Sequence, residues 1–239
     1  MSRWRKCDLT ITLSTCEPDR DCPLCPRLAA FRGAARAREP TWFNAPVPSW
    51  GDGTSSRLLI VGLAPGLRGA NRTGRPFTGD YAGDLLYSTL IAHGFASGIF
   101  AARVDDGLRL HNTRITNAVR CVPPQNKPLP VEITNCRPFL QATIAEMADL
   151  RAIVALGCVA HESVLRAFGL RLADFPFGHG REHAMDNKGL DNKGLDNKGL
   201  QLFDSYHCSR YNTNTGVLTA EMFNDVFARV RISLSANSH

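Results

Sequence analysis

Four short apolar runs, each followed by a stretch with helical spacing, constrain the fold of this chain more than any other feature. The runs are LLIVG at 58–62, ITNAV at 115–119, AIVALG at 152–157 and LFDSYH at 202–207. The helical stretches cover 81–93, 131–150, 159–168 and 219–230. This alternation predicts an α/β fold, a three-layer α/β/α sandwich around a central, mainly parallel four-stranded sheet. In such sheets the ligand site lies at the carboxyl ends of the strands.

The rest of the chain fits around one such domain. With 239 residues, we expect a single domain over 1–239 that acts as a monomer. Residues 1–50 are rich in Arg, Pro and Cys without sustained periodicity, which predicts an irregular arm with one short helix near Leu28 to Arg38. The sequence has neither a membrane-spanning apolar run nor a signal-peptide pattern, so we expect a cytoplasmic protein with no membrane partner.

The charge of the chain favours a polyanionic partner. The formal net charge is +6 and the pI is about 9.0. A basic surface suits DNA, although the same balance occurs in proteins that bind no nucleic acid. Charge therefore permits DNA binding without identifying it.

The cysteines suggest a metal or cluster site. Eight of them are more than packing requires in a reducing compartment. Cys22 and Cys25 form a C-x-x-C in the arm, Cys121 follows the second apolar run, and Cys136 lies 15 residues further on. Four thiolates from two segments can hold Zn(II) or an iron-sulfur cluster, and spacing does not choose between them. Cys16 is the main rival for a place in this site.

Three loops at the predicted strand ends carry residues suited to a flat ligand. The first, at 62–80, combines glycines that allow close backbone approach with the ring of Phe77, although such a loop could also cradle a phosphate. In the second, the Asn117 amide can give and take one hydrogen bond, as the pairing edge of uracil requires, whereas a turn residue is the ordinary alternative. The third, at 207–216, begins with His207 at a strand end, where structural histidines are also common.

A separate segment, DNKGLDNKGLDNKGL at 186–200, carries a five-residue unit three times. The unit is too short for a solenoid, and its Asn, Lys and Gly content predicts a surface loop lengthened by duplication. A basic flap over DNA is the functional alternative, but each unit carries one Lys and one Asp and so has no net charge.

The motifs in combination resemble the uracil-DNA glycosylase superfamily, and its family-5 (UDGb) branch most closely. They are GLAPG with NRTGRPFTGD, TNAVRC with PPQNKP, and H-x-S-R-x-N-T-x-T-G. The resemblance runs from about Cys22 to the last helix. It implies a monofunctional enzyme that flips uracil out of DNA and hydrolyses its N-glycosidic bond, which begins base-excision repair. With DNA as partner, we expect the protein at the nucleoid.

The resemblance also implies a cofactor and roles for residues. A [4Fe-4S] cluster with a structural role would be held by the four cysteines of the predicted site, Cys22, Cys25, Cys121 and Cys136. Phe77 would stack on the flipped base, Asn117 would read uracil, and His207 would hydrogen-bond the departing pyrimidine.

Other residues of these loops would line the pocket or contact DNA. Gly62, Ala64 and Gly66 would line the base pocket. Arg210 and Tyr211 are candidates to enter the DNA stack, with phosphate contact and surface packing as their ordinary alternatives.

The chain departs from better-known branches where water is activated. Ala64 stands where classical members carry Asp, and Leu63 stands where the family-4 branch carries Glu. Another polar residue of this loop must then orient the water, and we expect Asp80 first and Asn71 second.

Two more departures affect the pocket. Gly66 replaces a Tyr that rejects thymine in family 1, which predicts room for hypoxanthine, ethenocytosine or hydroxymethyluracil besides uracil. Cys208 stands where the motif usually has Pro, which predicts a looser loop around His207.

Two other functions stay open on sequence alone. One is an iron-sulfur protein of the same fold that binds DNA but has lost catalysis, as the absence of both water-activating carboxylates suggests. The other is a zinc-stapled nucleotide-binding domain. Lys127 is the single lysine in the three motifs and lies at the edge of the second, so a Schiff-base lyase step has no obvious nucleophile.

Overall fold

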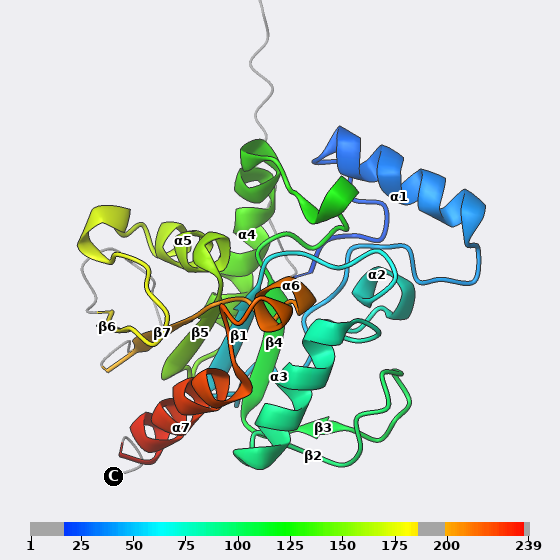
Figure 1. The fold of residues 1–239 in the computed structure, drawn as a ribbon. Coiled ribbons are helices and arrows are strands. Elements are labelled where there is room, and N and C mark those ends of the chain that lie inside the picture. Colours follow the sequence, from blue (N-terminus) through cyan, green and yellow to red (C-terminus); the bar gives the residue numbers. More distant parts are fainter. Residues whose placement is uncertain (1–16, 186–198, 237–239) are drawn as a thin grey trace, which may run out of the picture.

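The computed structural model describes residues 17–185 and 199–236, with a five-stranded sheet at their centre (Figure 1). The strand order is β4-β1-β5-β7-β6. Four strands are parallel: β1 (Leu58–Gly62), β4 (Thr113–Asn117), β5 (Ala152–Leu156) and β7 (Gln201–Ser205). The predicted parallel sheet is confirmed. The fifth strand, β6 (Glu182–Ala184), pairs antiparallel with β7 and corrects the predicted number of strands, because three residues at an edge give no strand pattern in the sequence.

Helices cover both faces of the sheet, as a three-layer sandwich requires. α3 (Tyr81–Ala92) and α7 (Ala220–Ala236) pack on one face, and α4 (Pro130–Glu146) and α5 (Cys158–Ala167) pack on the other (Figure 1). Strand residues alternate between the two layers. In β1, Leu58 and Ile60 enter the core beneath α3 and α7, whereas Leu59 and Val61 enter the core beneath α4 and α5. Every residue of β1 is buried, because neighbours cover both faces and both edges.

Short elements without a periodic pattern were not predicted. They are α2 (Ala70–Thr73), the antiparallel pair β2 (Ala96–Ser97) and β3 (Arg109–Leu110), α6 (Arg210–Asn214), and two 3-10 turns, η1 (Pro124–Asn126) and η2 (Leu172–Asp174). β4 begins ahead of the predicted run at 115–119. Residues 118 and 119 lie beyond the strand but still donate backbone hydrogen bonds to the carbonyls of Gly62 and Leu63.

Polar contacts attach the amino-terminal arm to the domain. Its helix, α1 (Pro26–Arg38), begins with a proline, whose missing N–H suits a first turn. Arg27 donates to the carboxylate of Glu132 in α4 at 2.8 and 2.7 Å, and the Glu132 side chain is buried. Further along the arm, Trp50 forms a β-bridge with Ile115 of β4. Figure 1 shows α1 beside the start of α4.

Two sequence expectations meet the limits of the described residues. Most of the DNKGL repeat, residues 186–198, lies outside them, as does Cys16. Within 17–185 and 199–236, no helix combines the length and apolar character needed to span a membrane.

A buried ion pair fastens the β2–β3 hairpin to the loop after β1. Arg75 donates to both oxygens of Asp106 at 2.9 and 2.7 Å, and these side chains are 5% and 0% exposed. The guanidinium lies 4.7 Å from the centre of the Trp50 ring, and the ring centres of Tyr87 and Phe100 lie at 5.7 and 5.8 Å. The Arg75 charge is therefore neutralised by one carboxylate inside an aromatic cage.

Replacing Asp106 by Asn should lower the free energy of unfolding by about 3 kcal/mol, because Arg75 is then left buried without a counter-charge. Asp105→Asn is the matched control: this side chain is 75% exposed, and we expect a change within about 0.5 kcal/mol. Urea unfolding followed by circular dichroism measures both. Equal effects of the two substitutions would show that the buried pair does not hold the hairpin.

Candidate active site

Three loops that are far apart in the sequence meet in one pocket at the carboxyl ends of β1, β4 and β7. The pocket is lined by Ala64, Pro65, Gly66, Ala70, Phe77, Asp80, Ala82, Asn117 and His207. The first two loops meet because β1 and β4 are neighbours, with Gly62 opposite Asn117. β7 lies on the far side of β5, and its loop crosses the strand ends to bring His207 to the pocket (Figure 1).

Phe77 occupies a strained backbone position that its neighbours enforce. Its φ of 52° lies in the left-handed region, which costs a residue other than glycine about 1–3 kcal/mol. Arg75 donates to Thr78 Oγ1 at 2.8 Å, and the Thr73 hydroxyl donates to the Thr78 carbonyl at 3.0 Å. A Cβ on Gly83 would lie 1.9 Å from the Phe77 carbonyl oxygen, so this approach requires glycine. The Phe77 ring is therefore held rigidly in the pocket wall.

Gly62 allows the Phe77 ring and the Asn117 amide to approach the end of β1. A Cβ on Gly62 would lie 2.5 Å from the Phe77 ring and from Asn117 Oδ1. Asn117 is 3% exposed, and its Oδ1 has no hydrogen-bond partner among the described residues. Since a buried acceptor without a partner is costly, this atom is suited to accept a hydrogen bond from a ligand in the pocket.

Asp80 brings a second buried acceptor to the same pocket. Within the described part of the chain its Oδ1 has no hydrogen-bond partner, and its Oδ2 lies beside Gly66 and Gly69. Burial raises the pKa of Asp80 against the opposing effect of the backbone N–H groups at the start of α3. A carboxylate with a raised pKa is a stronger base than an exposed one. The carboxylate also occupies part of the space that Gly66 leaves open.

His207 faces Phe77 across the pocket. The two ring centres are 6.2 Å apart, and the ring planes are tilted by 30°. The ring has some exposure to the pocket, yet protein atoms surround it closely enough that desolvation lowers the pKa of His207 to about 4. The imidazole is therefore neutral near pH 7 and offers an N–H donor without a positive charge.

The chain after His207 is fixed by three contacts. Ser209 Oγ accepts from the Asn212 N–H at 3.3 Å and caps α6, while Asn212 Nδ2 donates to the His207 carbonyl at 2.8 Å. The buried Cys208 thiol donates to the Ala82 carbonyl at 3.5 Å. A looser loop was expected at position 208, but the Cys208 thiol forms a hydrogen bond to the start of α3 that proline cannot form.

Two predicted site residues, Gly62 and Asn71, are not part of the pocket lining, and neither is Lys127 at the edge of the second motif. Asn71 is fully buried in α2, where its amide donates to Asn44 Oδ1 at 2.9 Å. Lys127 lies in an exposed loop, and its carbonyl accepts from Arg27. Among the described residues, the pocket lining thus contains one carboxylate, Asp80, and no lysine.

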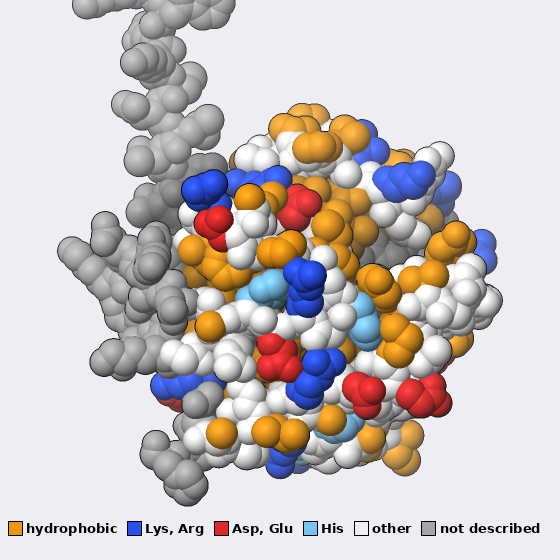
Figure 2. Space-filling model, turned by 60° about the vertical axis from the view of Figure 1, so that its left-hand side comes forward, with side chains coloured by type: hydrophobic (Ala, Val, Ile, Leu, Met, Phe, Trp, Pro, Cys, Tyr) orange, Lys and Arg blue, Asp and Glu red, His pale blue; other side chains and the backbone are white. Residues whose placement is uncertain are grey.

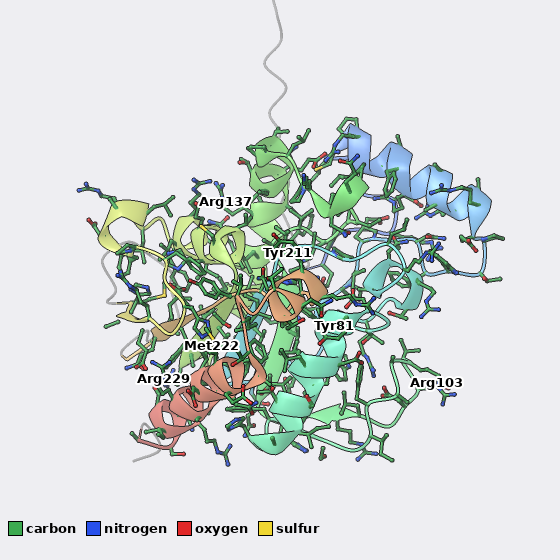
Figure 3. All side chains as sticks on the ribbon, viewed as in Figure 1. Tyr81, Arg103, Arg137, Tyr211, Met222 and Arg229 are labelled. Atoms are coloured by element: carbon green, nitrogen blue, oxygen red, sulfur yellow. The ribbon has the colours of Figure 1, made fainter. Side chains whose placement is uncertain are left out.

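Arg210 and Tyr211 lie on α6 at the molecular surface. The Arg210 guanidinium lies 5.3 Å from the centre of the Tyr81 ring, and Tyr211 is 74% exposed. Figure 3 labels Tyr81 on α3 and Tyr211 on α6. Figure 2 shows basic side chains on one face of the molecule with histidine side chains beside them near its centre. An aromatic ring and a cation are thus presented together to solvent.

Four cysteines line a second cavity beneath the arm. Cys22 and Cys25 come from the arm, Cys121 follows β4, and Cys136 lies in α4. Burial raises the pKa of Cys121 to about 11 and that of Cys136 to about 12. Ligation of a metal ion or cluster converts such thiols to thiolates. The structure therefore brings together the four residues that the sequence proposed as ligands.

Several N–H groups point at these sulfurs. Arg32 Nη1 donates to Cys121 Sγ at 3.3 Å, and the backbone N–H of Arg120 donates to Cys136 Sγ at 3.3 Å. Asn135 Nδ2 lies 3.9 Å from Cys25 Sγ. Donors of this kind stabilise negative charge on sulfur, as the surroundings of metal-thiolate and iron-sulfur sites do.

The cysteine sulfurs are spaced more widely than the ligands of one ion. Among the described residues, the one group of three or more metal-binding side chain types with all donor atoms within 4.8 Å of one another is His161, His183 and Asp204. The four cysteines form no such group. Around a single Zn(II), with Zn–S bonds of about 2.3 Å, tetrahedral sulfurs lie about 3.8 Å apart. No three of the four cysteine sulfurs therefore lie as close together as the ligands of one tetrahedral zinc ion.

Sequence reasoning missed residues that act through distant contacts. Arg75 stands inside the quoted motif NRTGRPFTGD, so its closeness to Phe77 was a usable signal, but its partner Asp106 is 31 residues away. Arg32 is one of many arginines in the arm, and no local pattern pairs it with Cys121, 89 residues further on.

Comparison with known proteins finds several similar sequences. The family model described as the uracil DNA glycosylase superfamily matches residues 48–231. A Type-5 uracil-DNA glycosylase of Thermus thermophilus is 44% identical over 216 residues, which cover 88% of this chain and 92% of that protein. A Type-5 uracil-DNA glycosylase of Mycobacterium bovis is 40% identical over 94% of this chain and 80% of that protein. One from Pyrobaculum aerophilum is 36% identical over 87% of each chain.

The protonation of His207 can be measured by NMR of histidine-labelled protein. We expect a ring that titrates at about pH 4 and is missing from the spectrum of His207→Gln, because burial disfavours the imidazolium ion. The unfolded chain takes up this proton at about pH 6.5, so the folded state should lose stability as the pH falls from there toward 4. A His207 midpoint at the ordinary value would contradict the desolvated environment.

Proposed function

This chain belongs to the uracil DNA glycosylase superfamily, and we propose from this that it removes uracil from DNA by hydrolysing the N-glycosidic bond, the first step of base-excision repair. The observation that carries the proposal is the convergence of Phe77, Asp80, Asn117 and His207 in one pocket. One chain supplies all these residues, so we expect a monomer to act, at the nucleoid where its substrate lies.

A flipped uracil would bind against Phe77 and Asn117. The rigid Phe77 ring offers a face for stacking. The unpartnered Asn117 Oδ1 would accept the N3–H of uracil, and the amide N–H would donate to a neighbouring carbonyl oxygen. With the amide in the orientation of this structure, cytosine, which has no N3–H, would leave the buried oxygen without a partner. The amide therefore favours uracil over the normal base from which it arises.

His207 would stabilise the leaving group. When the bond between C1′ and N1 breaks, its electron pair moves to uracil, which becomes an anion, while the sugar acquires oxocarbenium character. A neutral imidazole that donates its N–H to a uracil carbonyl oxygen stabilises charge that is present only in the transition state. The low pKa of His207 suits a hydrogen-bond donor better than a donor of a full proton.

Asp80 would orient and deprotonate the water. Its buried carboxylate has one oxygen without a partner among the described residues and is the single acidic group in the pocket lining. The water oxygen adds to C1′ as its proton passes to the Asp80 carboxylate. Asn71 does not share this role in our proposal, because its amide is turned toward Asn44.

Arg210 and Tyr211 are proposed to contact the DNA. Tyr211 is exposed enough to enter the space left by the flipped base, and Arg210, stacked on Tyr81, would bind a flanking phosphate. A lyase step is not proposed, because no lysine of the described residues lies in the pocket lining.

The four-cysteine cavity is proposed to hold a [4Fe-4S] cluster. Support comes from the donor set and from the N–H groups of Arg32, Arg120 and Asn135 that face the sulfurs. When bound, the cluster would serve a structural role. The cysteines of the arm and of the β4–α4 segment would then share one group, which joins the arm to the domain.

Base release is tested with end-labelled duplexes that contain U·G, U·A, hypoxanthine·T or T·G, followed by alkali to cleave abasic sites. We expect cleavage at uracil, and only after alkali. His207→Ala should slow release by about 100- to 1000-fold with little change in DNA binding, because one transition-state donor is lost. The control is His111→Ala, an exposed histidine at the opposite end of β4, which should leave the rate unchanged. A folded, iron-containing protein that binds these duplexes and releases no base would favour the non-catalytic binder.

The cofactor is tested by analysis of anaerobically purified protein. We expect a brown protein with iron and acid-labile sulfide in equal amounts. Cys121→Ser and Cys136→Ser should lose both and expose the arm to proteolysis, whereas Cys158→Ser, an exposed cysteine away from the cavity, should keep both. Stoichiometric zinc in a colourless protein would contradict the cluster.

A further inference from the structure

A second cluster of titratable side chains lies inside the protein, and the proposed reaction does not use it. His161 comes from α5, His183 from β6 and Asp204 from β7. Their side chains are 2%, 10% and 0% exposed. Asp204 lies on the strand that leads to His207, three residues ahead of it. A buried group at this place can influence the position of the end of β7, from which His207 extends into the pocket.

With Asp204 ionised, the contacts of His161 require a proton on each ring nitrogen. Nδ1 lies 2.7 Å from Asp204 Oδ1, and Nε2 lies 2.8 Å from the Phe175 carbonyl oxygen. Both neighbours are acceptors, so a neutral imidazole, which has one N–H, can satisfy one of them and not the other. The geometry therefore fits an imidazolium ion that bridges a carboxylate on β7 and a carbonyl in the loop at 175–180.

Asp204 completes the network on its other oxygen. Its Oδ2 lies 3.1 Å from His183 Nε2 and accepts from the Gly178 N–H at 3.3 Å. These are hydrogen-bond distances. Around a tetrahedral zinc ion with bonds of about 2.0–2.1 Å, the donor atoms would lie about 3.3 Å apart, which exceeds the 2.7 Å between His161 and Asp204. A proton rather than a metal ion therefore joins the His161 ring to Asp204.

The loop held by this network reaches the residue next to His207. The Phe175 carbonyl accepts from His161, and the Gly178 N–H donates to Asp204. The same loop carries His179. His179 Nδ1 accepts the backbone N–H of Tyr206 at 3.1 Å, and its ring stacks on Tyr206 with centres 4.9 Å apart. The backbone just ahead of His207 is thus bonded to a loop that is held by His161 and Asp204, together with the Gly180 N–H, which donates to the Asp204 carbonyl at 2.8 Å.

We propose that His161 is a positioning residue: through the loop at 175–180 it fixes the backbone at Tyr206 and so aims the His207 ring at the departing base. The inference rests on the proposed function of His207. It assigns a role in base release to a residue of α5 that lies outside the pocket.

The charge of His161 gives the network a pH dependence. Burial lowers its pKa, but the hydrogen bond and charge of Asp204 and the Phe175 carbonyl outweigh this, so the pKa of His161 is raised. The other titratable groups near it are His183 on β6 and Glu162 on its own helix. As the pH rises through the raised pKa, the ring loses a proton and releases Asp204 or the loop. Base release should therefore decline as the pH rises through the raised pKa of His161, above the range in which His207 becomes neutral.

Two substitutions divide the contacts of His161. In His161→Asn the amide nitrogen stands near the position of Nδ1 and can donate to Asp204 only. In His161→Gln it stands near Nε2 and can donate to Phe175 only. The control is His93→Asn, the same substitution at another partly buried histidine. Its ring Nε2 lies 3.1 Å from Asn224 Oδ1, away from the pocket.

The readout is the single-turnover rate of uracil release from a U·G duplex over the neutral to alkaline range, with DNA binding measured by fluorescence anisotropy. Both His161 variants should release uracil about tenfold to 100-fold more slowly, because the N–H donor of His207 is displaced from the departing base. DNA binding should be nearly unchanged, and the decline in rate that the wild type shows with rising pH should be lost. Rates and pH profiles equal to wild type in the folded variants would overturn the proposal.

Two further arms keep the test decisive. His179→Phe retains the ring stacked on Tyr206 but removes the acceptor of its N–H, so a slower rate is expected even where the His161 variants fold poorly, and an unchanged rate overturns the proposal. If the wild type releases no base, the proposed function fails, and NMR decides the positioning: the His207 midpoint of about 4 should move toward its ordinary value in His161→Asn. An unchanged midpoint, or one zinc ion per chain that depends on His161 and Asp204, would also overturn it.

Discussion

The parallel pairing of β1 with β4 on one edge and β5 on the other fixes the relation of everything else in the structure. Every residue of β1 is buried, and its side chains alternate between two cores. A shift by one residue would move each of them to the wrong layer, so hydrophobic burial enforces the register. That register places Gly62 opposite Asn117, and the pocket inherits its geometry from this pair.

The pocket concentrates unfavourable features that the rest of the molecule stabilises. Phe77 has a left-handed backbone, and the buried oxygens Asn117 Oδ1 and Asp80 Oδ1 have no partners within the described residues. Such features persist where the surrounding contacts allow no other conformation. The pair of Arg75 and Asp106 restrains the Phe77 loop in this way. A ligand that donates hydrogen bonds and stacks on the ring relieves these costs on binding, whereas an apolar ligand cannot.

Polar networks add to apolar packing in holding the segments that surround the pocket. The arm is attached by Arg27 and Glu132 and by the cysteine cavity, and the loop at 175–180 is attached by His161 and Asp204. Removing one partner of a buried charged pair costs more than the intact pair contributes. Such pairs therefore select one arrangement of an irregular segment, where apolar contacts would tolerate several.

The sequence by itself determined the layers of the fold, the edge at which the site lies, and most of the pocket residues. Strand and helix periodicity is local, and a strand end carries its next residues to a known edge of a parallel sheet. The resemblance of the three motifs to the uracil-DNA glycosylase superfamily then singled out Phe77, Asn117 and His207 without coordinates. Tertiary structure decided what depends on distant partners: it turned Asn71 toward Asn44 and added β6 to the sheet edge. It also joined Arg75 to Asp106 and His161 to Asp204. A hydrogen bond forms over about 3 Å, and residues 31 or 43 positions apart reach that distance only after the chain has folded, so no local pattern in the sequence records them.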